Sequence, residues 1–152
     1  MISNGAPAVG SAGYLVGADM IPSQLRHVGF DGQTEVGFDA GTGNFVSGSP
    51  IVAEGGVAYW VSRTGTLFVT DEGLSALRWS APLGTGGSVV ASPNFDCNRS
   101  GAGGVLYLAT TNGRLTSILV DSSRLAATDW PKWQHDSQNS GNADFPLNAG
   151  CP

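Results

Sequence analysis

The sequence predicts an all-β protein built from repeated antiparallel sheets. Three observations support this fold class. Only 12% of the 152 residues are charged, 23 are glycine, and short apolar runs alternate with glycine-rich turns, which is typical of all-β domains. The dipeptide Asn112-Gly113 separates two apolar runs, the strongest local signal for a β-hairpin. A unit with several strands also occurs twice along the chain, as expected for a repeat architecture.

The clearer repeat relates residues 48–79 to residues 91–130. Each copy begins with Ser-Pro and continues through a short run, a glycine-rich turn and a strand, VAYWVS or VLYLAT. A two-residue turn and a second strand follow, TLFVTD or LTSILVD, and each copy ends at a tryptophan, Trp79 or Trp130. Each copy therefore predicts a four-stranded sheet. Such a sheet repeated at about 40–50 residues is the signature of propeller blades.

A more divergent unit precedes these two. It contains GYLVGADM, QLRHVGF and FDAGTGNF, whose acidic, small and glycine residues fit the turns between blade strands. We therefore interpret the chain as one β-propeller-like domain, residues 1–152. Its blade-like units cover residues 12–46, 47–83 and 87–130, and residues 131–152 form a C-terminal closing segment.

The repeat pattern resembles the PQQ-like (quinoprotein-type) β-propeller repeat, which also occurs in BamB-like outer-membrane assembly factors. The segment WPKWQHDSQNSGN, residues 130–142, is similar to the WPxxxHDxxxxGN segment that borders such domains in bacterial surface proteins. The resemblance covers residues 12–142 and implies a propeller fold, but most domains with this repeat bind no quinone. With two histidines and three blades, the chain is not expected to bind PQQ.

Three blades do not close a ring, because a propeller usually needs four to eight. The outer blades would each leave an apolar sheet face in water, which soluble proteins rarely tolerate. We therefore expect an incomplete propeller that is completed by self-association or by missing residues. A homodimer is favoured, because two-fold symmetry dominates among oligomers.

Charge and cysteine content restrict the partners and the compartment. The net charge of −5, without a basic stripe, excludes nucleic-acid binding through phosphate neutralisation. No apolar run is long enough to predict a membrane span, and the first residues lack the features of a signal peptide. Cys97 and Cys151 lie in loop-like contexts and are candidates for a structural disulfide; two free thiols are the alternative. A disulfide implies a secreted, periplasmic or cell-surface protein.

The two histidines are the candidate metal ligands. His135 and Asp136 are adjacent, and imidazole and carboxylate together suit several divalent ions. Neighbouring residues of a strand point to opposite faces, so this pair suits a shared ion only in a loop. If His27 also reaches the propeller channel, Asp19 and Asp31 become further candidate ligands. The alternative interpretation is a structural role for both histidines.

Two functions follow from these interpretations. The first is a non-catalytic propeller scaffold or interaction module that binds protein or glycan, with Tyr59, Trp60, Tyr107 and Trp133 as candidate ligand-facing aromatics. For Tyr59, Trp60 and Tyr107, a place in the blade core is the alternative. The second is a metal-dependent hydrolase of esters or phosphoesters, in which an ion held by His27 and His135 lowers the pKa of a bound water. No G-x-S-x-G elbow or phosphate-binding loop is present to support other enzyme classes.

Overall fold

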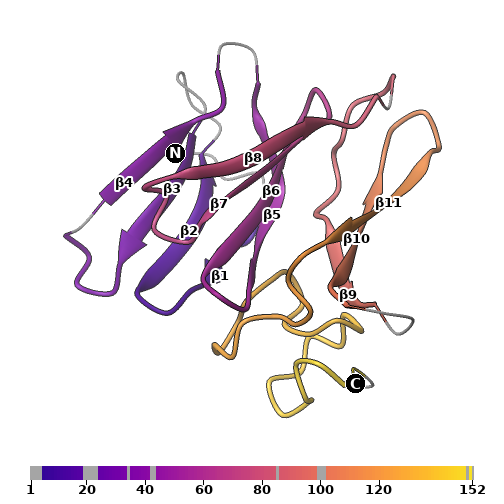
Figure 1. The fold of residues 1–152 in the computed structure, drawn as a ribbon. Coiled ribbons are helices and arrows are strands. Elements are labelled where there is room, and N and C mark those ends of the chain that lie inside the picture. The colour runs from indigo at the N-terminus through magenta and orange to yellow at the C-terminus, as the bar shows by residue number, and fades with distance from the viewer. Residues whose placement is uncertain are drawn as a thin grey trace.

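Three antiparallel sheets follow one another along the chain in the computed structural model (Figure 1). The model describes residues 5–18, 24–33, 35–41, 44–84, 86–98, 102–149 and 151. The first sheet contains β1 (Ala8–Val9), β2 (Gly13–Ala18), β3 (Gln24–Gly29) and β4 (Glu35–Asp39) in spatial order. The second contains β5 (Val46–Ala53), β6 (Val57–Ser62), β7 (Thr66–Asp71) and β8 (Leu77–Pro82). The third contains β9 (Asn94–Cys97), β10 (Gly104–Ala109) and β11 (Leu115–Val120).

The second sheet lies between the other two, and its strands β5 and β6 are buried on both faces. Every residue of β6 is buried, and neighbouring side chains of a strand point to opposite faces. Tyr59 therefore packs in the core towards the third sheet, with Phe95, Leu106 and other apolar residues. Trp60 packs in the core towards the first sheet and stacks on Phe68 at 4.4 Å between ring centroids. The two cores hold the three sheets together as stacked blades.

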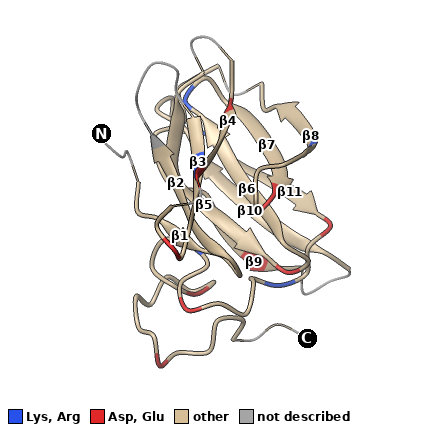
Figure 2. Ribbon diagram, turned by 90° about the vertical axis from the view of Figure 1, so that its left-hand side faces the viewer, with Lys and Arg blue, Asp and Glu red and all other residues tan. Residues whose placement is uncertain are grey.

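The predicted fold class is confirmed. The described residues form three antiparallel sheets in an open arrangement and contain no helix, and therefore none long and apolar enough to cross a membrane. Figure 2 shows that charged residues are sparse and lie mostly at strand ends and in loops. The sheet interiors are therefore left to apolar packing, as the low charge content predicts.

The third sheet corrects one detail, because it has three strands where we expected four. The segment after β11 does not pair with β11. It crosses to the second sheet, where Leu125 forms an antiparallel bridge with Ala53 and the Ala126 N–H donates to the Val52 carbonyl at 3.1 Å. Trp130 is consequently not the counterpart of Trp79, which lies within β8.

The two Ser-Pro starts of the repeat meet where the second and third sheets adjoin. The Ser49 N–H donates to the Ser92 hydroxyl at 2.9 Å, and the Ser47 hydroxyl donates to the Val89 carbonyl at 2.6 Å. Gly48 has a positive φ of 69°, and a Cβ at this position would lie 2.6 Å from the backbone of Ser92. Only glycine allows this close approach.

Candidate functional site: the C-terminal clasp

Residues 130–149, which we call the clasp, contact all three sheets and lie at the yellow end of the chain in Figure 1. The Trp130 carbonyl accepts a hydrogen bond from Val9 N–H of β1 at 2.7 Å. The Pro131 carbonyl accepts one from Val52 N–H of β5, also at 2.7 Å. The Ser137 carbonyl accepts a longer one, 3.5 Å, from the side-chain amide of Asn94 in β9.

A disulfide between Cys97 and Cys151 adds a covalent connection between β9 and the segment after the clasp. The two Cα atoms lie 5.6 Å apart, and the sequence separation is 54 residues. The Asn148 side chain also accepts a hydrogen bond from Leu125 N–H at 2.9 Å. The C-terminal residues are therefore tied to the body of the protein at several points.

Lys132 is the polar centre of the clasp and is only 1% exposed. Its ammonium donates to the carbonyl of Trp133 at 2.8 Å, to the carbonyl of Asp136 at 2.9 Å and to the side-chain oxygen of Asn139. An ammonium has three protons, so these acceptors use its full donor capacity. Burial lowers the pKa of Lys132 to about 8, although the Asp136 carboxylate acts in the opposite direction.

Asp136 is fully buried and closes the loop that follows it. Its carboxylate accepts hydrogen bonds from Gln138 N–H at 2.7 Å, from Ser140 N–H at 3.1 Å and from the Ser140 hydroxyl. Burial alone would raise the pKa of Asp136, but these hydrogen bonds to the charged form lower it below its ordinary value. The carboxylate therefore serves as an acceptor for the turn.

His135 packs against Trp130, with ring centroids 5.0 Å apart, and is 4% exposed. Its Nδ1 lies 3.6 Å from the Asp136 carboxylate, beyond hydrogen-bond distance. Gln134 and His135 both have a positive φ, 60° and 72°, which is uncommon outside glycine and places the histidine in a tight loop. His135 also lines an open hollow of about 520 Å³ with Asp129, Asp144 and apolar residues of the clasp.

The structure does not assemble the three-residue metal site. His27 lies in β3 of the first sheet, 7% exposed, and neither ring nitrogen has a hydrogen-bond partner. It lines a separate hollow with Asp31 and Phe30. Among the described residues, ligand atoms of three His, Cys, Asp or Glu residues come together only at Asp96, Cys97 and Cys151, and there both sulfurs are in the disulfide.

His27, His135 and Asp136 therefore form no common ligand group among the described residues: His27 lies in β3 and His135 in the clasp. Asp136 also uses its carboxylate for the turn at Ser140. Asp19 lies outside the described residues.

The four candidate aromatics divide into two pairs. Tyr59 and Trp60 are 1% and 0% exposed, so the expectation that they face a ligand is wrong. They are core residues because each fills one of the two interfaces between sheets. Tyr107 and Trp133 are 36% and 47% exposed and remain available at the surface.

Sequence reasoning missed the role of Lys132. A signal was present, because Lys132 is the only lysine in the chain and stands between two tryptophans. A lone cation in an aromatic segment of an otherwise charge-poor protein could have suggested a buried, hydrogen-bonded ammonium.

Comparison with solved structures identifies the architecture. The crystal structure of BamB from Moraxella catarrhalis is similar, with a TM-score of 0.57 and 20% sequence identity. The chain is a partial β-propeller. The match covers 86% of this chain and 35% of BamB, so the chain spans about a third of that protein. BamB contains the PQQ-like propeller repeat, and at this identity the likeness shows the fold alone. No family model matches the chain, and no curated protein is similar in sequence.

Proposed function

We propose that this protein is a non-catalytic β-propeller scaffold, or interaction module, that binds another protein through the outer faces of its first and third sheets. The observation that carries the proposal is the exposure of apolar side chains on these faces. Tyr14 of β2 and Phe30, which directly follows β3, are 41% and 55% exposed, and Leu115 and Leu119 of the third sheet are 72% and 71% exposed. Tyr14 and Phe30 pack edge to face with ring centroids 5.1 Å apart, and exposed apolar patches mark interaction sites.

The internal chemistry of the clasp supports the same proposal. Lys132 and Asp136, which have the charged groups most shielded from water, bond to carbonyls and N–H groups of their own loop. Hydrogen bonds of this kind indicate a structural role for both side chains. The clasp joins the three sheets at Val9, Val52 and Asn94, and so keeps the two outer faces in a defined arrangement.

An extracytoplasmic setting is part of the proposal. The disulfide between Cys97 and Cys151 supports it, because disulfides persist in oxidising compartments. The likeness to BamB is compatible with this setting.

Site-specific photocrosslinking in the native cells tests the proposal. A photoreactive amino acid at Tyr107 or Tyr14 is expected to give adducts with another protein, whereas the same residue at Gln138, an exposed polar position of the clasp, is expected to give none. Equal labelling at all three positions, or no adduct from either face, would refute the interaction role. If the purified protein contains metal in stoichiometric amount and hydrolyses esters, and a chelator abolishes the hydrolysis, an enzymatic function would replace the interaction role.

A further inference from the structure

β11 is a free edge strand of the third sheet. The strand order is β11-β10-β9, so β11 pairs with one strand only. Thr110 N–H donates to the Arg114 carbonyl at 3.0 Å, at the start of the β10–β11 ladder. Because antiparallel hydrogen bonds alternate along a strand, the N–H and C=O groups of Leu115, Ser117 and Leu119 point away from β10. No hydrogen bond from these groups is present in the described part of the chain.

This edge lacks the features that protect the outer edges of the other sheets. Edge strands normally avoid pairing with other chains by means of charges, prolines or bulges. β4 carries Glu35 and Asp39, and β8 carries Arg78 and Pro82. β11, with the sequence LTSILV, contains neither a charge nor a proline. Its sequence suits an inner strand, and the segment that would have covered it crosses to β5 instead.

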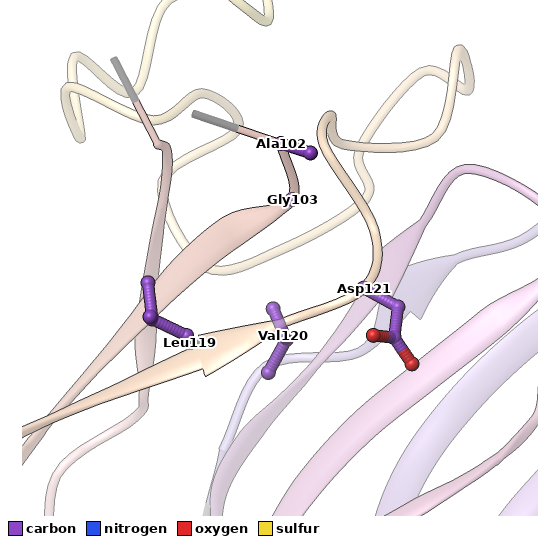
Figure 3. Close-up of a pocket in the computed structure, with 5 residues that line it drawn as sticks. All are labelled: Ala102, Gly103, Leu119, Val120 and Asp121. Carbon is purple, nitrogen blue, oxygen red and sulfur yellow. The ribbon is translucent and has the colours of Figure 1, made fainter. Parts of the chain in front are cut away.

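Side-chain exposure agrees with an uncovered edge. Leu115, Ser117 and Leu119 are exposed, while Thr116 and Ile118 on the other face are half-buried. Figure 3 shows the end of this strand, where Leu119, Val120 and Asp121 line a hollow of about 240 Å³ together with Ala102 and Gly103. Leu115 and Leu119 are 72% and 71% exposed, so an apolar partner on this edge would remove both side chains from water.

We infer that β11 pairs antiparallel with β11 of a second copy of this chain, about a two-fold axis at Ser117. In this register Leu115 lies opposite Leu119 of the partner subunit, and Leu119 lies opposite Leu115 of the partner subunit. All three outward-pointing residues then form hydrogen-bonded pairs, and two leucine pairs cover each other on the same face. The inference rests on the proposed interaction role, for which it names one partner and one contact.

Charge complementarity supports a second copy as the occupant. Arg114 precedes β11 and Asp121 follows it, and both are exposed. Antiparallel self-pairing brings the beginning of one strand to the end of the other. Arg114 then lies opposite Val120 of the partner subunit, one position out of register with Asp121 of the partner subunit, so opposite charges lie at the same end of the contact. The buried surface of one strand pair is below the roughly 1,200 Å² of a standard interface, so we expect a weak, concentration-dependent dimer.

Sedimentation velocity from low micromolar to near-millimolar concentration is the first test. The wild type is expected to change from monomer to dimer. Leu119→Lys, which places two ammonium groups at the contact, is expected to weaken association by about tenfold or more. Leu77→Lys is the matched control, because Leu77 is a half-exposed leucine of β8, and it should leave association unchanged. Circular dichroism verifies that both variants fold.

Cysteine crosslinking tests the register. The two Ser117 Cα atoms of a hydrogen-bonded pair are expected about 5.5 Å apart, within the range of a disulfide. Ser117→Cys should therefore form a covalent dimer on mild oxidation, and Thr111→Cys, at the far end of the hairpin, should not.

A monomer at every concentration, a dimer insensitive to Leu119→Lys, or equal crosslinking at both positions would overturn the inference. With any of these three results, photocrosslinked adducts between this protein and a different protein would still support the proposed interaction role. If the β11 dimer forms but no adduct with a different protein is found, only the wider interaction role is refuted.

Discussion

Replacing Lys132 by methionine tests whether the clasp is held by hydrogen bonds to a buried ammonium. Methionine has a similar volume and no donor, so Lys132→Met removes the three hydrogen bonds to Trp133, Asp136 and Asn139 and the charge with them. Two effects of opposite sign result. The variant leaves acceptors without a partner, but it no longer has to bury a charged group.

The magnitudes decide which effect is larger. Burial lowers the pKa of Lys132 from 10.5 to about 8. Removing the buried charge therefore raises the free energy of unfolding by roughly 3 kcal/mol at neutral pH. Losing a hydrogen-bond partner costs about 1–3 kcal/mol per acceptor, with the buried Asp136 carbonyl at the upper end and the two half-buried acceptors at the lower end, about 5 kcal/mol in all. We expect Lys132→Met to lower the free energy of unfolding by about 2 kcal/mol.

Urea unfolding followed by circular dichroism measures this difference, with the exposed Arg78→Met as control. Because the folded protein releases the Lys132 proton at lower pH than the unfolded chain does, the wild type should also gain stability relative to the variant as the pH rises from about 8 to 10.5. A variant as stable as the wild type at neutral pH would refute the reasoning, since burial of the charge would then outweigh the hydrogen bonds.

Three further predictions concern the clasp and its surroundings. Lys132, the only lysine, should be acetylated by an amine reagent only after unfolding, as peptide mass mapping would detect; labelling of the native protein would show that the clasp opens. Hydrogen bonds lower the pKa of Asp136 in the folded protein. The stability that the Asp136 carboxylate contributes should therefore be present above its unfolded-state pKa of about 3.8 and be lost as the pH falls through its folded-state pKa. Asp136→Asn should flatten this part of the dependence of the free energy of unfolding on pH. Replacing both Cys97 and Cys151 by serine should lower the free energy of unfolding by roughly 4 kcal/mol in the chain-entropy model, measured by urea unfolding, and an unchanged midpoint would contradict a structural role of the disulfide.

Local sequence was sufficient to predict the individual sheets. The run VAYWVS became β6 and VLYLAT became most of β10, because each has a strong strand preference and ends at a turn that glycine makes accessible. The open arrangement of three sheets also followed from counting the repeats.

The sequence alone determined which segments are strands and that they would stack in an open row, since both depend on turn chemistry and on the alternation of apolar side chains along a few residues. Only the tertiary structure decided the path of the chain after β11, where Leu125 pairs with Ala53 in place of a fourth strand. It also decided that Lys132 is buried, and that His27, His135 and Asp136 form no common ligand group among the described residues. These outcomes depend on contacts between residues distant in the sequence, whose geometry no local pattern encodes.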